Sequence, residues 1–166
     1  MKLKEFNALE TAKMQDELVR CNGSSNWVKK MLAAAPYADM LEVHDKADEM
    51  WNQCGPDDFK EAYSHHPKIG NVELKEKFAK TASWSKGEQA GVAVATEKVI
   101  EELSDLNLEY EKKHGFIFIV CATGKTAEEM LDILRERFPN STDKEIGIAA
   151  EEQRKITHIR INKLLS

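Results

Sequence analysis

The residues best suited to proton chemistry lie in the run 64–70, which reads Ser-His-His-Pro-Lys-Ile-Gly. Imidazole gains and loses a proton near neutral pH, so a histidine held in one direction can act as a general acid or base. Pro67 restricts the backbone of the residue before it, which makes His66 the candidate acid–base residue. An ordinary loop histidine beside a helix-ending proline would give the same local pattern.

A second candidate segment is Ser85-x-x-Glu88-Gln89. Its pattern is that of a capping box, in which a serine and a glutamate close the start of a helix. The same pattern places Ser85, Glu88 and Gln89 at a helix N-terminus, where unpaired amides attract anions. Gly87 would allow a close approach to this helix start. Alone, the segment indicates only a helix cap.

Arg160 is the third candidate. A last helix is predicted over about residues 143–165, and Arg160 lies on or beside its inward stripe, four residues after Ile156 and four before Leu164. A guanidinium in that position either pairs with an internal carboxylate or offers its fork of N–H donors to a substrate carboxylate or ureido oxygen. The sequence leaves both interpretations open.

Two other kinds of site are not predicted. Gly124-Lys125-Thr126 resembles the end of a phosphate-binding loop, but Ile119 stands where that motif requires glycine. His65 and His66 are adjacent and point in different directions, and no histidine or cysteine pair has the spacing of metal ligands. We therefore expect no nucleotide, no metal and, at Thr126, only a helix cap.

The bulk composition is that of a globular protein. The 166 residues include 24 basic and 29 acidic ones, which are interspersed without the basic stripe typical of nucleic-acid binding. No apolar run approaches the roughly 20 residues that span a bilayer, and the first residues lack the apolar core of a signal peptide. Three cysteines, an odd number without paired spacing, favour a reducing compartment. We expect a cytoplasmic protein that binds neither nucleic acid nor membrane.

Helices are the elements expected to position these candidates, because apolar residues recur at spacings of three and four between short breaks. Asn7 is expected to cap a first helix that ends at Gly23, and Thr142 with Glu145 to cap the last one. Other helices are expected over 27–34, 38–54, 57–64 and 71–80, from 85 to a break near 104–105, from there to 114, and from 126. The sequence predicts an all-α fold, a single-domain bundle of about eight helices covering residues 1–166.

The run Phe116-Ile-Phe-Ile-Val-Cys-Ala122 is the exception. Its apolar periodicity is that of a buried strand, but the sequence offers no second strand to pair with it. We interpret it as a buried extended connector near residues 116–122. Its backbone polar groups then need other partners, and a ligand could be one of them.

Taken in order, these segments resemble the 2-oxo-4-hydroxy-4-carboxy-5-ureidoimidazoline (OHCU) decarboxylases of the urate pathway. The resemblance spans almost the whole chain and rests on several motifs in the family's order. They are Cys21-Asn22-Gly23-Ser24 with Trp27 and Met31, His66-Pro67-Lys68-Ile69-Gly70, Ser85-x-x-Glu88-Gln89-Ala90-Gly91, Leu106-Asn107-x-x-Tyr110-Glu111, the run from Gly115 to Ala122, and Glu151-x-x-x-Lys155-Ile156-Thr157 before Arg160.

The resemblance implies an all-α homodimer without metal or organic cofactor, which decarboxylates the small molecule OHCU to (S)-allantoin and CO₂ in purine catabolism. It implies that His66 and Glu88 are catalytic, and leaves either of them as the final proton donor. The implied substrate-binding residues are Pro67, Ser85, Lys86, Gly87, Glu88, Gln89, Phe118, Ile119, Val120, Cys121, Ala122 and Arg160.

A competing interpretation is a non-catalytic helical interaction module. In that class of protein, Trp27, Trp51 and Trp84 would be the docking side chains on the surface. We expect these three indoles to lie in the core or at its rim, which does not favour the module.

Overall fold

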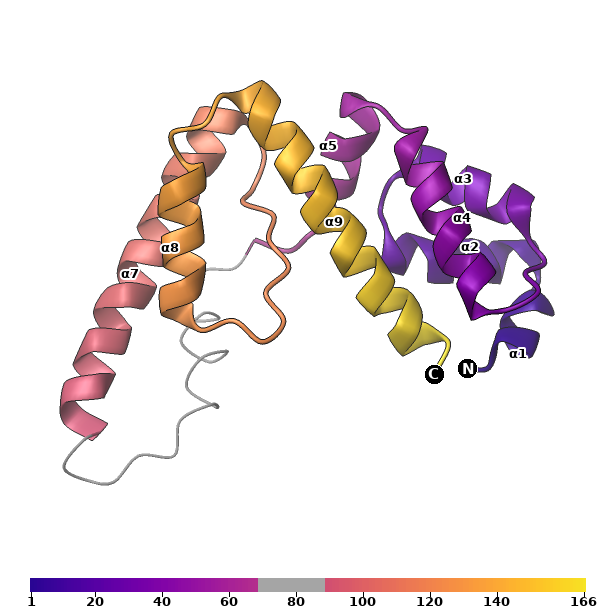
Figure 1. The fold of residues 1–166 in the computed structure, drawn as a ribbon, viewed down its shortest axis with the longest axis horizontal. Coiled ribbons are helices and arrows are strands. Elements are labelled where there is room, and N and C mark those ends of the chain that lie inside the picture. The colour runs from indigo at the N-terminus through magenta and orange to yellow at the C-terminus, as the bar shows by residue number, and fades with distance from the viewer. Residues whose placement is uncertain (69–88) are drawn as a thin grey trace. The chain divides into compact units, whose positions relative to one another are not determined.

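The computed structural model describes residues 1–68 and 89–166, with side chains described outside 69–96. These ranges contain eight helices (Figure 1) and no strand, which confirms the predicted all-α fold. The helices are α1 (Leu3–Asn7), α2 (Thr11–Cys21), α3 (Ser25–Ala34), α4 (Met40–Asn52), α5 (Pro56–Ser64), α7 (Gln89–His114), α8 (Ala127–Arg137) and α9 (Thr142–Leu164). The helix expected over 71–80 lies outside the described residues. No described helix is long and apolar enough to cross a membrane.

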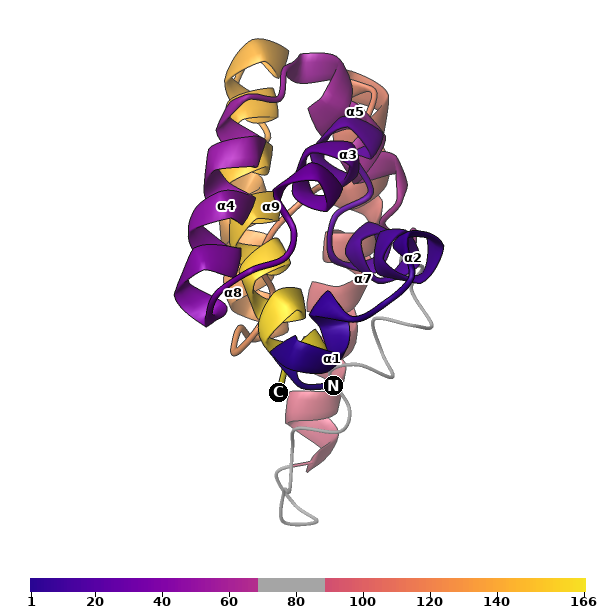
Figure 2. The ribbon, with the colours of Figure 1, turned by 90° about the vertical axis from the view of Figure 1, so that its right-hand side faces the viewer.

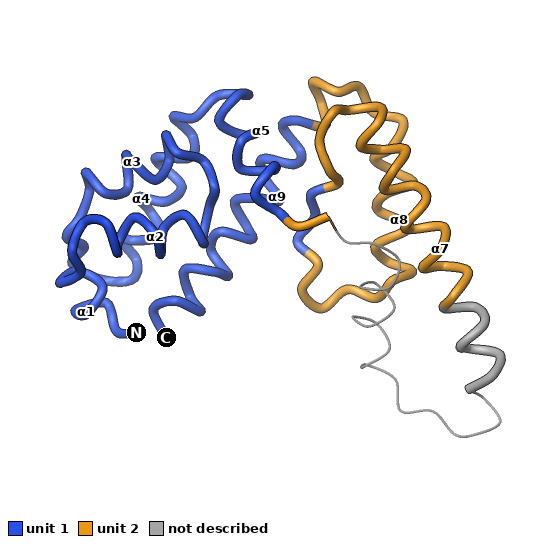
Figure 3. The backbone as a smooth tube through the Cα atoms, turned by 180° about the vertical axis from the view of Figure 1, so that it is seen from behind, with its two compact units in different colours: residues 1–66, 119–121, 146–166 blue, residues 67–118, 122–145 orange. Residues whose placement is uncertain are grey.

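The chain divides into two compact units, shown in Figure 3. Unit 1 contains residues 1–66, 119–121 and 146–166, and so holds α1 to α5 and most of α9. Unit 2 contains residues 67–118 and 122–145, with α7 and α8. The single-domain organisation of residues 1–166 stays a prediction.

Two indoles lie in the core of unit 1. Trp27 of α3 donates its ring N–H to the Ala47 carbonyl oxygen at 3.0 Å, and Trp51 of α4 donates to the Ala150 carbonyl oxygen at 2.9 Å. Both side chains are buried, so their apolar surface is removed from water and their N–H groups remain satisfied. Trp27 and Trp51 are core residues, as expected, and do not form the docking surface of the competing interaction module; Trp84 lies outside the described residues.

The first helical segment differs from the prediction. Asn7 is the last residue of α1 instead of the cap of a long helix over 7–23, and α2 begins separately at Thr11. The Asn7 amide donates to the Tyr37 carbonyl oxygen at 2.8 Å and accepts the Tyr37 N–H at 3.0 Å. This pairing across 30 residues uses the groups that a cap would need. Figure 2 shows α1 beside the end of α9, where the Met1 amino group donates to the Leu164 carbonyl oxygen at 2.8 Å.

The long helix of unit 2 is also simpler than predicted. α7 passes through Ser104 and Asp105 without a break. Neither residue is proline or glycine, so each costs only a few tenths of a kcal/mol in a helix. Packing of α7 against α8 offsets this cost, with Leu103 on one helix and Leu134 on the other both buried.

The capping boxes predicted at Thr126 and at Thr142 have different outcomes. Thr126 accepts the Glu129 N–H at 3.2 Å and Glu129 accepts the Thr126 N–H, which confirms the cap of α8. The box at Thr142 and Glu145 is wrong, because Ser141 accepts the Lys144 N–H at the start of α9. Glu145 instead lies buried among partners from α7 and α8 in unit 2.

The run 116–122 forms neither a helix nor a strand, as predicted for a connector. In unit 2, the Phe118 ring packs edge-on against the Tyr110 ring with centroids 5.4 Å apart. In unit 1, the Cys121 N–H donates to the Glu152 carboxylate at 2.7 Å. The backbone N–H of Cys121 is therefore satisfied by a side chain where a sheet would have used a neighbouring strand.

Candidate active site

His66 lies directly after α5, in unit 1. The helix ends at Ser64, and the His66 N–H donates to the Tyr63 carbonyl oxygen at 3.2 Å. The next residue, Pro67, disfavours helical geometry before it, so the chain leaves the helix here with the imidazole half-buried. The helix end and the proline thus set the direction of the candidate acid–base residue.

Both ring nitrogens of His66 have partners in unit 1. Nε2 lies 2.5 Å from Oε1 of Gln153, and Nδ1 lies 3.5 Å from a guanidinium nitrogen of Arg160. A carbonyl oxygen only accepts and a guanidinium only donates. These two partners favour a hydrogen on Nε2 and a lone pair on Nδ1.

The surroundings favour the neutral form of this imidazole. Burial lowers the pKa of His66 from its usual 6.5, and the charges of Arg160 and His65 lower it further. The hydrogen bond to Gln153 acts in the opposite direction on this pKa without reversing it. His66 is thus a neutral base at neutral pH.

Arg160, on α9, is partly buried, and its partners within the described part of the chain are uncharged groups. Besides His66, it donates to the backbone carbonyl oxygens of Arg20 and Cys21, at 3.3 and 3.4 Å. Among the residues that the structure describes, no carboxylate forms an ion pair with it, and burial lowers its pKa. Within this part of the chain, the interpretation with an internal carboxylate is not met. The guanidinium is placed to bind an anion beside the basic nitrogen of His66.

Sequence reasoning missed Gln153 and its supporting residues. The side-chain amide N–H of Gln153 donates to the Thr157 hydroxyl at 3.2 Å. That hydroxyl donates to the backbone carbonyl oxygen of Gln153 at 2.8 Å. The Asn22 amide also donates to the Thr157 hydroxyl, at 3.4 Å. All three side chains are buried. The available signal was a glutamine on the inward stripe of the last helix, seven residues before Arg160.

Gly23 lies against the residue before His66. A Cβ atom at this position would lie 2.5 Å from Cβ of His65 and 2.3 Å from its Cγ. These atoms are at the root of the side chain and move only with the backbone. Glycine therefore allows the turn between α2 and α3 to approach the end of α5 that carries His66.

Residues 118–122 of the connector are divided between the two units. Ile119, Val120 and Cys121 belong to unit 1, whereas Phe118 and Ala122 belong to unit 2. The Cys121 N–H is already donated to Glu152. Substrate binding by the backbone of residues 118–122 stays a prediction.

The remaining predicted site residues are not brought together by the described structure. Pro67 is exposed and belongs to unit 2. Ser85, Lys86, Gly87 and Glu88 lie outside the described residues, and of Gln89 only its position as the first residue of α7 is described. Pairing of His66 with Glu88 stays a prediction. Among the described residues, no group of three or more histidine, cysteine, aspartate or glutamate side chains could hold a metal ion.

The fold and the site together define a class of protein, namely a small helical protein with a neutral histidine beside an arginine. The family model described as OHCU decarboxylase matches residues 7–162. The chain belongs to the OHCU decarboxylase family, as the sequence motifs predict.

Relatives with assigned names agree with this membership. The chain is 40% identical over 153 residues to the uric acid degradation bifunctional protein TTL of Arabidopsis thaliana, covering 92% of this chain and 47% of that protein. It is 31% identical over 96 residues to the 2-oxo-4-hydroxy-4-carboxy-5-ureidoimidazoline decarboxylase of Xenopus laevis, covering 58% of this chain and 55% of that one. The chain therefore spans about half the length of these relatives.

Solved structures share the fold. A crystal structure of OHCU decarboxylase in the presence of (S)-allantoin aligns with a TM-score of 0.72 and 38% identity, covering 90% of this chain and 97% of that chain. A crystal structure of (S)-allantoin synthase aligns with a TM-score of 0.67 at 19% identity, covering 98% of this chain and 53% of that one. The second likeness concerns the fold alone.

Proposed function

We propose that this protein is a carboxy-lyase that converts OHCU to (S)-allantoin and CO₂ in urate degradation. The observation that carries the proposal is the pair formed by His66 and Arg160 in unit 1. A neutral imidazole and a guanidinium without a carboxylate partner in the described residues suit a substrate that carries a carboxylate and a ureido group. Family membership supports the same reaction.

The chemistry requires charge stabilisation and one proton transfer. The bond between the ring carbon and its carboxylate breaks, CO₂ leaves, and the electron pair is delocalised over the ring as an enolate-like charge. One proton is then added to a ring carbon on one face, which sets the S configuration. Arg160 orients the substrate and opposes the developing negative charge, while His66 exchanges the proton.

Further residues of the family's motifs complete the proposed site. Glu88 is the proposed working partner of His66 in the proton steps. Ser85, Lys86, Gly87 and Gln89 would bind the substrate, with Pro67 and the backbone of residues 118–122. These assignments rest on the family's motif and keep the reaction free of a cofactor.

A coupled assay tests the activity. Urate, urate oxidase and hydroxyisourate hydrolase generate the substrate, and circular dichroism follows the formation of chiral allantoin with and without this protein. The wild type should accelerate the formation of one enantiomer, and His66→Asn should lower turnover by about 10²-fold or more. Formation of allantoin at the spontaneous rate would overturn the proposal and favour a binding module. Omitting the hydrolase tests whether the protein performs that preceding step itself, which we do not expect.

We also propose that the protein is a cytoplasmic homodimer. Membership of the family supports the dimer, and the location is supported by Cys21 and Cys54, which are thiols as in a reducing compartment. Light scattering after size-exclusion chromatography should give about twice the 18.8 kDa chain mass. A monomer mass at micromolar concentration would contradict the dimer.

A further inference from the structure

We infer that Gln153 is a positioning residue that holds His66 in its Nε2–H tautomer, so that Nδ1, which faces Arg160, is the atom that exchanges protons. Its catalytic consequence rests on the proposed decarboxylase function, whereas the tautomer itself does not. The inference starts from the 2.5 Å contact between Nε2 of His66 and Oε1 of Gln153.

The direction of the Gln153 amide is fixed by the groups behind it. The Thr157 hydroxyl has one hydrogen, which it donates to the Gln153 backbone carbonyl oxygen at 2.8 Å. Its lone pairs can therefore only accept, and they receive N–H donors from the amides of Gln153 at 3.2 Å and Asn22 at 3.4 Å. Because the NH₂ group of Gln153 is used on Thr157, its carbonyl oxygen must face His66.

Asn22 is held in the same way at the far end of this chain of hydrogen bonds. Its Oδ1 accepts the Ser24 backbone N–H at 3.0 Å, which leaves its NH₂ group to face Thr157. Gln153 is 0% exposed, so water does not compete for its carbonyl oxygen. Every donor from Asn22 to His66 thus has one direction, and the opposite tautomer of His66 would leave the Gln153 oxygen facing a lone pair.

The neutrality of Gln153 decides how the base behaves. A carboxylate at this position would stabilise the imidazolium form of His66 and raise its pKa. An amide fixes the same tautomer without adding a charge, so Nδ1 stays unprotonated beside the Arg160 cation. An anion bound by Arg160 would then lie next to the unprotonated Nδ1.

Nitrogen NMR of the wild-type protein tests the tautomer without substrate. In a long-range ¹H–¹⁵N spectrum, the His66 signals are identified by their loss in His66→Asn. We expect the pattern of a proton on Nε2 and none on Nδ1 at neutral pH. A proton on Nδ1, or a mixture of both tautomers, would overturn the inference.

Activity of Gln153 variants tests the consequence. Gln153→Glu should move the acidic limb of the kcat/KM profile to higher pH by about one unit or more, since a carboxylate partner raises an imidazole pKa. Gln153→Met should lower kcat by about tenfold with KM unchanged, and should populate both tautomers in the NMR spectrum. If the acidic limb of the kcat/KM profile of Gln153→Glu lay at the same pH as in the wild type, the positioning role would be overturned.

Asn162→Asp provides a matched control on the same helix. Asn162 Oδ1 lies 2.8 Å from Nε2 of His44, so this variant makes the same amide-to-acid change beside a histidine outside the site. Its activity profile should match the wild type, and a shift equal to that of Gln153→Glu would count against a local role. If the NMR pattern is the expected one but no allantoin forms, the tautomer stands and the proposed function fails.

Discussion

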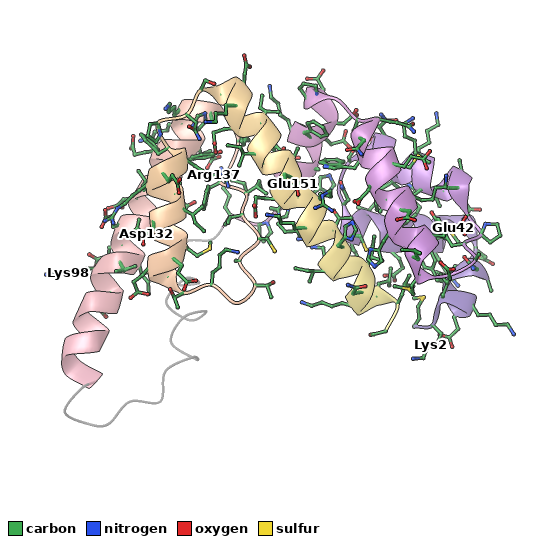
Figure 4. All side chains as sticks on the ribbon, in the orientation of Figure 1. Lys2, Glu42, Lys98, Asp132, Arg137 and Glu151 are labelled. Carbon is green, nitrogen blue, oxygen red and sulfur yellow. The ribbon has the colours of Figure 1, made fainter. Side chains whose placement is uncertain are left out.

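Two arginines, one in each unit, differ in the groups that contact their guanidinium. Arg137 at the end of α8, labelled in Figure 4, is 6% exposed and contacts the Glu145 carboxylate at 2.8 Å. Arg160 on α9 contacts backbone carbonyl oxygens and an imidazole, and no described carboxylate. The same residue type is therefore neutralised in unit 2 and retains its charge in unit 1.

The surroundings of Arg137 are those of a structural pair. Burial acts to raise the pKa of Glu145, but hydrogen bonds from Asn140 and Tyr110 and the charge of Arg137 together hold that pKa below its usual value. The guanidinium also lies 4.7 Å from the centre of the Phe118 ring. The pair thus joins α7, α8 and the start of α9 around the connector, whereas the charge of Arg160 remains for a ligand.

The largest expected effect is on stability, from removing the charge of Arg137. Arg137→Met leaves the Glu145 carboxylate buried without its cation, which should lower the free energy of unfolding by about 3–5 kcal/mol. Urea unfolding followed by circular dichroism measures this loss. The double variant Arg137→Met/Glu145→Met should recover about half of it or more, because it removes both buried charges. A single variant as stable as the wild type would show that the pair is not structural.

Arg160→Met should mainly affect activity. Loss of charge-assisted hydrogen bonds to a bound anion costs about 1.5–3 kcal/mol, which corresponds to a decrease of about 10- to 150-fold in kcat/KM. Stability should change by only about 1 kcal/mol, because no carboxylate among the described residues is left unpaired. Steady-state kinetics and urea unfolding on the same preparations separate the two effects.

Arg154→Met is the control for this variant. Arg154 also lies on α9, but it is paired with Glu151, labelled in Figure 4, at 2.7 Å and with Asp48 at 3.4 Å. This partly exposed cluster should contribute at most about 1 kcal/mol to stability and nothing to activity. Equal losses of activity in the Arg154 and Arg160 variants would remove the distinction between paired and unpaired arginines.

Gly23→Ala tests how far the site in unit 1 depends on close packing. The added Cβ overlaps the root of the His65 side chain, and overpacking of this kind costs about 1–3 kcal/mol. The end of α5 should shift, and kcat/KM should fall because His66 moves with it. Gly55→Ala is a suitable comparison at the start of α5, since a Cβ atom there meets nothing within 4 Å. A Gly23→Ala protein with normal activity would show that the position of His66 tolerates this shift.

The smallest expected effects are those of pH on stability. Burial lowers the pKa of His66 and of His114 in the folded protein, so the unfolded chain takes up these protons first as pH falls. The free energy of unfolding should therefore have its full value above pH 6.5. It should decrease as the pH falls from 6.5 toward the lower pKa values that these histidines have in the folded protein. The lowered pKa of Glu145 adds a second loss, which begins below about pH 4.5.

Urea unfolding at a series of pH values separates these windows. His114→Phe and His66→Asn should each weaken the decrease that begins below pH 6.5, while Glu145→Gln should remove the later one. A Glu145→Gln protein that kept the acid-side loss would assign that loss to other carboxylates.

Local interactions explain which predictions were correct. The Thr126 cap depends on a glutamate three residues away, and the end of α5 depends on a proline two residues beyond its C-cap region, so both are visible in the sequence. The absence of a strand at 116–122 followed from the lack of a partner segment. His66 and Arg160 were identified by residue type and by the order of the family's motifs, and the structure brings these two together.

Tertiary structure decided the features that depend on distant partners. Thr142 and Glu145 have the spacing of a capping box, but Arg137, Tyr110 and Asn140 provide Glu145 with stronger partners in a buried position. Gln153 meets His66 across 87 residues, and nothing in its own segment reveals that contact. The sequence by itself determined the all-α class of the fold and the chemical groups available. The tertiary structure decided which carboxylate pairs with Arg137 and which nitrogen of His66 is favoured to carry its proton. The reason is that these contacts form only when folding brings distant residues together and removes their polar groups from water.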